Sequence, residues 1–265
     1  GDIELIKEKL YEILKNFLDW GFVTRVRERI VSTRIGKRIS ELYIDPLSAN
    51  EFLNGLGKSS KKQIIEFSFL QLISNSLEMR PLVSVRSSEA EEIQKIILER
   101  NRHILQDIPE EYDIEFEDFQ DSIKTALMFD YWINEATEDK VLTKFNVAPG
   151  ELYNKLQLID WLVYALHELA LLSGYKELLT EIRKLRVRLK YGIKEELMAL
   201  VKLKGIGRVR ARKLFNAGLV SLESLRKAQP ESIIKIIGVK TTREIKKQLG
   251  EKTEEIDEDK QSTLN

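Results

Sequence analysis

Residues 200–215 read "LVKLKGIGRVRARKLF" and contain six cations but no acidic residue. Apolar residues lead into a turn with two glycines, and a small residue follows in the expected next helix. These positions are Leu200, Leu203, Gly205, Ile206, Gly207, Ala211, Leu214 and Phe215. Two glycines around one buried apolar residue permit a tight turn whose backbone N–H groups face outward. The stretch therefore predicts a helix–hairpin–helix.

The cations around this turn indicate what it binds. Backbone N–H groups at the start of a helix, together with the helix dipole, favour an anion. Neighbouring Lys and Arg side chains add counterion release when the anion belongs to a nucleic-acid backbone. Such contacts hold the backbone without reading bases. We expect phosphate contacts from Lys204, Gly205, Ile206, Gly207, Arg208, Arg210, Arg212 and Lys213.

The alternative for this stretch is an ordinary glycine turn before a basic, solvated helix end. A degenerate second copy of the pattern lies in "SIIKIIGVKTTREI" (232–245), which keeps one of the two glycines, Gly238. We interpret the second copy as a packing partner of the first rather than as a second phosphate site.

Charge is segregated along the chain although the total is neutral, with 43 basic and 43 acidic residues. Residues 183–213 hold twelve Lys or Arg against two Glu, whereas 107–121 hold eight carboxylates and no cation. A basic segment between acidic segments suggests a binding site for a polyanion on a surface that otherwise does not attract polyanions. We interpret the acidic stretch as a solvated loop and helix start; DNA mimicry and metal binding are the alternatives.

Composition narrows the class of protein. A chain of 265 residues allows one large domain or two to three smaller ones. It lacks cysteine and has two histidines, which argues against disulfides and a structural zinc site, so we expect no bound metal. It shows neither a signal peptide nor an apolar run of about 20 residues. We therefore expect no membrane partner and an intracellular protein, cytoplasmic and associated with the nucleoid.

The first 57 residues predict part of a winged helix. Apolar residues recur with helical spacing up to Gly21, and a β-branched segment then predicts a two-stranded ribbon turning near residues 27–28. Ser32 or Thr33 is the expected N-cap of the next helix, and Asp45 before Pro46 starts another. Helix, ribbon and helix form the back half of a winged helix.

The remaining chain reads as helix after a polar break at 57–62. We expect a partial winged helix at 1–57, a helical bundle at 58–197, a helix–hairpin–helix domain at 198–250 and a disordered acidic tail at 251–265. The predicted fold class is all-α with a small β-ribbon.

Three ordered segments resemble one known family. They are "TRIGKRISELYIDPLSA" (33–49), "FDYWINEATEDKVLTKFNVAPGELYNKLQLIDWLVYALHELA" (129–170) and "KEELMALVKLKGIGRVRARKLFNAGL" (194–219). Together they resemble the C-terminal third of the archaeal Holliday-junction-migration (Hjm) helicases, which are superfamily-two, Ski-like DNA helicases related to the helicase half of polymerase theta. The resemblance covers essentially residues 1–250.

The resemblance implies two motor domains, then a winged helix, a helical ratchet bundle and a helix–hairpin–helix domain. In the family, ATP hydrolysis drives 3′→5′ unwinding of forked or branched DNA in replication-coupled repair. This chain has no GxxxxGK[ST] motif, so we expect it to bind no cofactor and to be inactive as an ATPase by itself. ATP and Mg would belong to the motor domains.

The resemblance also implies a ratchet helix that crosses the path of the translocating single strand. The matching helix is 150–173, and Trp161 matches the aromatic residue that stacks on a base. Seven residues earlier, where the family can carry arginine, stands Asn154, with Lys155 beside it. A core tryptophan is the alternative for Trp161, and we interpret Trp132 as core.

The tail ends in Gln261-Ser-Thr-Leu264, which resembles the first half of a sliding-clamp-binding motif; an accidental match is the alternative. The leading hypothesis is the DNA-binding part of a helicase, with single-stranded or forked DNA and the motor domains as partners. A protein-interaction module that docks the motor or a replication partner is the second. A nuclease or glycosylase is disfavoured because no catalytic lysine or aspartate adjoins the hairpin.

Overall fold

The computed structural model describes residues 2–250 and divides them into two compact units. The first contains the chain up to Tyr131 together with Thr137–Arg186, and the second contains Trp132–Ala136 together with the chain from Val187. The expected division at 57 falls within the first unit, and the division between the units near residue 187 precedes the expected start of the hairpin domain at 198. The reason is packing, because Val187 and Ile193 contribute to the core of the second unit.

The ribbon and its flanking helices form as the sequence predicts. The strands pair antiparallel, with Val26 opposite Arg29. Thr33 accepts a hydrogen bond from the N–H of Gly36 (3.1 Å), and Asp45 accepts one from the N–H of Leu47 (2.8 Å), so both N-caps are confirmed. The elements are α1 (Asp2–Asp19), β1 (Val23–Val26), β2 (Arg29–Ser32), α2 (Arg34–Leu42) and α3 (Pro46–Lys58).

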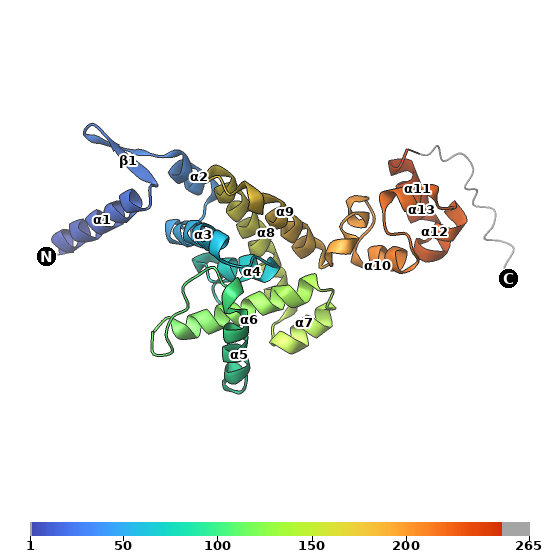
Figure 1. Cartoon of the computed structure of the whole chain (residues 1–265), viewed down its shortest axis with the longest axis horizontal. Helices are drawn as coiled ribbons and strands as arrows, with labels where there is room; N and C mark the ends of the chain where they lie inside the picture. The colour runs from blue at the N-terminus through green and yellow to red at the C-terminus, as the bar shows by residue number, and fades with distance from the viewer. Residues whose placement is uncertain (1, 251–265) are drawn as a thin grey trace. The chain divides into compact units, whose positions relative to one another are not determined.

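The rest of the first unit is a bundle arranged around α8, which contacts α2, α3, α4 and α7 (Figure 1). Its core is rich in fully buried phenylalanines, such as Phe52, Phe67, Phe69 and Phe129. The helices are α4 (Glu66–Ser74), α5 (Ala90–Arg100), α6 (Phe116–Ile133), α7 (Glu138–Phe145), α8 (Pro149–Leu172) and α9 (Leu179–Tyr191). Short 3-10 turns lie at Ser59–Lys61, Leu77–Met79, Ser87–Glu89, Asn101–His103 and Lys176–Leu178.

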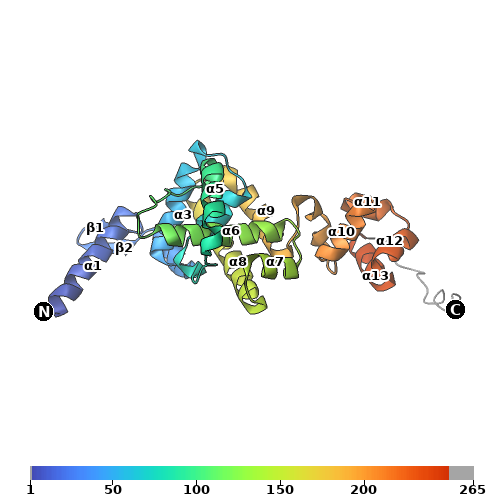
Figure 2. The ribbon, with the colours of Figure 1, turned by 90° about the horizontal axis from the view of Figure 1, so that it is seen from below.

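The second unit is a small helical domain, drawn in orange and red in Figure 2. The apolar positions of the predicted hairpin are buried, among them Leu200, Leu203, Ile206, Ala211 and Leu214. Its elements are the 3-10 turns Glu195–Leu197 and Leu200–Lys202, then α10 (Arg208–Asn216), α11 (Leu222–Lys227), α12 (Pro230–Ile237) and α13 (Val239–Gln248). The prediction of an all-α fold with one small ribbon is confirmed.

Two general features bear on function. No helix within residues 2–250 has the length and apolar character needed to cross a membrane. The same residues contain no group of three or more His, Cys, Asp or Glu side chains arranged to hold a metal ion.

Candidate nucleic-acid interface

The hairpin turn depends on the backbone conformation of its glycines and on hydrogen bonds to Gln248. Gly205 has φ +91°, a region that favours glycine, whereas Gly207 is extended and caps α10 without a side-chain hydrogen bond. The N–H of Lys204 donates to Gln248 Oε1 (2.8 Å), and Gln248 Nε2 donates to the Lys204 carbonyl (3.0 Å). The turn is thereby fastened to α13, and the first N–H groups of α10 have no acceptor within the helix.

Three of the expected phosphate contacts are exposed cations: Lys204, Arg210 and Lys213. Arg210 Nη1 donates to the carbonyl of Gly205 at 2.8 Å, which holds the guanidinium beside the turn. A guanidinium held there leaves other N–H groups for an anion, because Arg carries five donors. These side chains lie in the turn and in the first two turns of α10, so positive charge and donors are concentrated near the N-terminus of that helix.

Arg208 has a different environment from its neighbours. Its guanidinium carbon lies 4.8 Å from the ring centroid of Trp132, and it donates to the carbonyl of Ala136. Burial lowers the pKa of Arg208, and the charge of Glu135 partly opposes that shift. Trp132 is half-buried and donates from Nε1 to the carbonyl of Leu189 (2.8 Å). Trp132 was expected to be a core residue. It is only half-buried, and the Arg208 guanidinium lies over one face of its indole in a cation–π contact.

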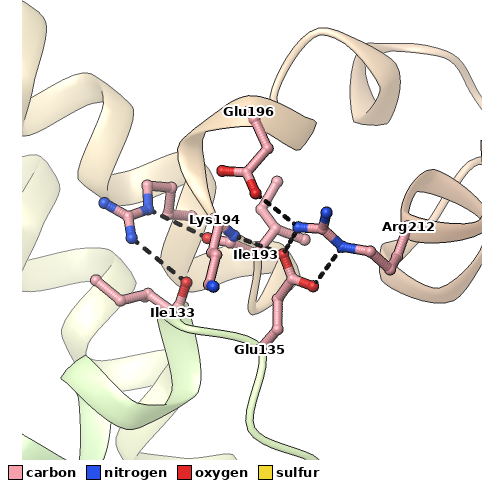
Figure 3. A network of polar contacts seen from close by, with 7 residues as sticks. Ile133, Glu135, Ile193, Lys194, Glu196 and Arg212 are labelled. Carbon is pink, nitrogen blue, oxygen red and sulfur yellow. Dashed lines mark hydrogen bonds and ion pairs between the residues drawn. The ribbon is translucent and has the colours of Figure 1, made fainter. Parts of the chain in front are cut away.

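Arg212 lies in a carboxylate network rather than on an open surface (Figure 3). It binds Glu135 through two hydrogen bonds, Nε to Oε2 at 2.8 Å and Nη2 to Oε1 at 2.5 Å, and Nη2 also reaches Glu196 Oε1 at 2.9 Å. The backbone N–H of Lys194 donates to Glu135 Oε1 at 3.1 Å. Next to this network, Arg188 donates to the carbonyls of Ile133 and Ile193.

The network changes the pKa values of its carboxyl groups. Burial alone raises the pKa of Glu135, but the hydrogen bonds from Arg212 and from the Lys194 backbone outweigh it and leave that pKa below its usual value. The pKa of Glu196 is lowered in the same way, since Arg212 outweighs burial. Arg208 and Arg212 therefore contact the 132–136 segment, a role that the sequence did not reveal because Glu135 lies 77 residues before Arg212.

The residues expected on the ratchet helix lie on α8, and the structure separates them. Asn154 is exposed, and Trp161 is half-buried with Nε1 donating to the carbonyl of Leu42 at 3.0 Å. Lys155 is only 3 % exposed, and its ammonium donates to the carbonyls of Met79 (3.3 Å) and Pro81. Burial lowers the pKa of Lys155. The structure therefore does not place Lys155 on the surface that a phosphate contact requires.

Gln261 and Leu264, the residues expected to bind a sliding clamp, lie outside the described part of the chain. The acidic stretch 107–121 is a loop that leads into α6 at Phe116, in agreement with its interpretation as a loop and helix start.

Two known protein families match parts of the chain. Residues 67–192 match the family described as "Archaeal helicase, domain 4", and residues 197–251 match "SAM-like Helix-hairpin-helix tandem". The two matched segments are together similar to the C-terminal region of archaeal helicases. The tandem description agrees with a second hairpin around Gly238, which has φ +83° between α12 and α13.

Several curated proteins are similar to the chain over most of its length. ATP-dependent DNA helicase Hel308 of Thermococcus kodakarensis is 36% identical over 254 residues, which are 94% of this chain and 22% of that protein. The Hel308 proteins of Methanocaldococcus jannaschii and Pyrococcus abyssi are 37% and 33% identical over 95% and 100% of the chain. The chain spans only 20% and 37% of those two helicases.

Proposed function

We propose that the chain is the DNA-binding part of an ATP-dependent 3′→5′ DNA helicase that acts on forked or branched DNA. Support comes from the similarity to Hel308 helicases and from the exposed cations around the hairpin turn. The observation that carries the proposal is Arg210, held on the Gly205 carbonyl beside the free N-terminus of α10. A phosphate that docks there would meet backbone N–H groups of α10 and the positive charge of Lys204, Arg210 and Lys213.

In this mechanism each unit contributes one kind of contact. The hairpin holds phosphates through Lys204, Arg210, Lys213 and the backbone of α10, without reading sequence. On α8, Trp161 offers an aromatic surface to a base, and the exposed amide of Asn154 donates a hydrogen bond to the backbone. Stacking tolerates any base, which suits a strand that moves through the site. The contact of Nε1 with Leu42 fixes the indole while part of the ring stays accessible.

The remaining parts of the proposal concern partners outside the described residues. ATP and Mg would bind in motor domains, which also supply the force for translocation. A sliding clamp would bind the tail at Gln261 and Leu264. Such a protein would be located in the cytoplasm, associated with the nucleoid.

Single-strand binding by two matched variants tests the proposal. In fluorescence anisotropy with a labelled oligonucleotide, Arg210→Gln should weaken binding and reduce the slope of log K against log salt by about 0.7. Trp161→Ala should weaken binding by about 1–3 kcal/mol and leave that slope unchanged. Lys227→Gln, at an exposed lysine paired with Glu223 on α11, is the charge control. Binding that ignores salt and both variants would refute the proposal.

The second candidate function, docking of a protein partner, is favoured by α1. This helix exposes a series of large apolar side chains: Ile3, Leu5, Ile6, Leu10, Tyr11 and Ile13 are 49–72% exposed. Exposed apolar patches commonly mark interaction surfaces. Pull-down of separately expressed motor domains without DNA, repeated with Ile6→Ser and Leu10→Ser, tests this candidate; capture that both variants leave intact would reject α1 as the docking surface.

A further inference from the structure

Tyr43 combines two unfavourable features on the surface of the first unit. It is the C-cap of α2, with φ +57° and ψ +27°, and its side chain is 87% exposed. Glycine or asparagine is the usual residue at a left-handed helix end, because a Cβ strains that conformation. Within residues 2–250 the phenol makes no hydrogen bond and no ring contact. The backbone strain at Tyr43 is therefore not offset by interactions of its side chain.

The residues on either side of Tyr43 in the sequence are buried. Leu42 and Ile44 are 5% and 4% exposed, and both belong to the core. The chain therefore projects one large aromatic side chain between two anchored positions. Anchoring on both sides fixes where the ring starts, which lowers the entropy lost when the ring binds something.

This projection lies next to Trp161. The Leu42 carbonyl that accepts the indole N–H at 3.0 Å belongs to the peptide bond that leads into Tyr43. A carbonyl oxygen and the following Cα are about 2.8 Å apart across a trans peptide, so the Tyr43 Cα lies within about 6 Å of Trp161 Nε1. The N–H edge of the indole thus faces the peptide bond that leads into Tyr43.

The rings of Trp161 and Tyr43 do not stack on each other. Trp161 and Tyr43 form no ring pair in the described structure, although their attachment points are close. Aromatic groups that are held near each other but remain unpaired suit successive bases of a single strand, since every base has a π-face.

We propose that Tyr43 is a second stacking residue, which binds the nucleobase next to the one on Trp161. The inference rests on the proposed function, because it uses the strand path across α8. It makes the surface at the end of α2 part of the single-strand site, with an unpaired nucleobase as its ligand.

The strain at Tyr43 gives the test its direction. In Tyr43→Gly the left-handed conformation becomes unstrained and no buried contact is lost, so the melting temperature of the 265-residue chain should stay equal or rise. Affinity for a labelled single strand should nevertheless fall by about fivefold to a hundredfold. The salt slope should stay unchanged because no charge is removed. Tyr43→Phe, which keeps the ring, should bind within about twofold of the original chain.

Two further variants separate the possible failures. Tyr112→Gly removes another tyrosine, 85% exposed in the acidic loop, and should leave binding unchanged. If Trp161→Ala weakens binding while Tyr43→Gly does not, Tyr43 is no stacking residue and the proposed function stands. If neither variant affects binding, the strand path over α8 is wrong and both proposals fail there.

Discussion

Arg212 and Glu135 form a two-pronged ion pair between α10 and the loop after α6, with hydrogen bonds of 2.8 and 2.5 Å. Their side chains are 27% and 16% exposed, so water screens the pair only in part. Glu135 itself has φ +67°, a left-handed conformation that is uncommon for a residue with a Cβ. The basic block thus combines exposed cations with cations that stabilise the fold.

We first predict that Glu135→Ala destabilises the second unit by about 1–3 kcal/mol, because Arg212 loses two hydrogen bonds while partly buried. Chemical denaturation combined with hydrogen exchange of α10 measures the change. Glu223→Ala, which breaks an exposed pair on α11, should cost less than about 0.5 kcal/mol. Equal effects of the two variants would show that the Glu135 network contributes no more than a surface pair.

Acid should weaken the same network. The folded-state pKa values of Glu135 and Glu196 lie below the unfolded value of 4.5, so the folded chain holds fewer protons than the unfolded chain as the pH approaches 4.5. Their contribution to stability is present above the unfolded pKa and is lost as the pH falls through the folded pKa. Protection of α10 against hydrogen exchange should therefore decline below about pH 4.5. Glu135→Gln should flatten this decline, and an unaltered decline would contradict the assignment.

Lys155→Met should lower stability without changing the electrostatics of DNA binding. The buried ammonium donates to the carbonyls of Met79 and Pro81, and removing it leaves both without that donor at a cost of about 1–3 kcal/mol. The salt slope of single-strand binding should remain constant. Lys140→Met, at an exposed lysine of α7, is the matched control for stability. A reduced slope with full stability would instead identify Lys155 as a phosphate contact.

Alanine at the two hairpin glycines should produce different defects. Gly205 has φ +91°, and an added Cβ would lie 3.4 Å from Glu244 Oε2, so Gly205→Ala should cost at least about 1–2 kcal/mol of stability. At Gly207 an added Cβ meets nothing within 4 Å. Gly207→Ala should therefore fold normally but bind a single strand more weakly, since the methyl occupies the space in front of α10. Melting curves and anisotropy on both variants measure this contrast, and normal binding by Gly207→Ala would place the phosphate elsewhere.

Local patterns predicted the elements well because the determining interactions lie within a few residues. The caps at Thr33 and Asp45 use N–H groups two or three residues away. The ribbon turn and the hairpin follow from residue types in a short window. The two glycines of the hairpin permit a tight turn, and Gly205 adopts the left-handed conformation there.

The roles of individual cations could not be predicted in this way. Arg208, Arg210 and Arg212 alternate along one segment and look equivalent in sequence. At about 100° per residue, Arg208 and Arg212 lie one turn apart on the same face of α10 and both contact the 132–136 segment, whereas Arg210 lies about 200° round the helix from each of them. One meets Trp132, one stays exposed at the turn, and one meets Glu135.

Residue types and their spacing were sufficient to predict the fold class, the hairpin and the caps, and they also carry the resemblance to archaeal helicases. Which charges remain at the surface depends instead on how the helices pack. Lys155 is buried and donates to the carbonyls of Met79 and Pro81, and Arg212 is paired with Glu135. Each of these contacts joins positions more than 70 residues apart. Such partners meet only when the helices pack, because long-range contacts follow from the arrangement of whole elements rather than from local spacing.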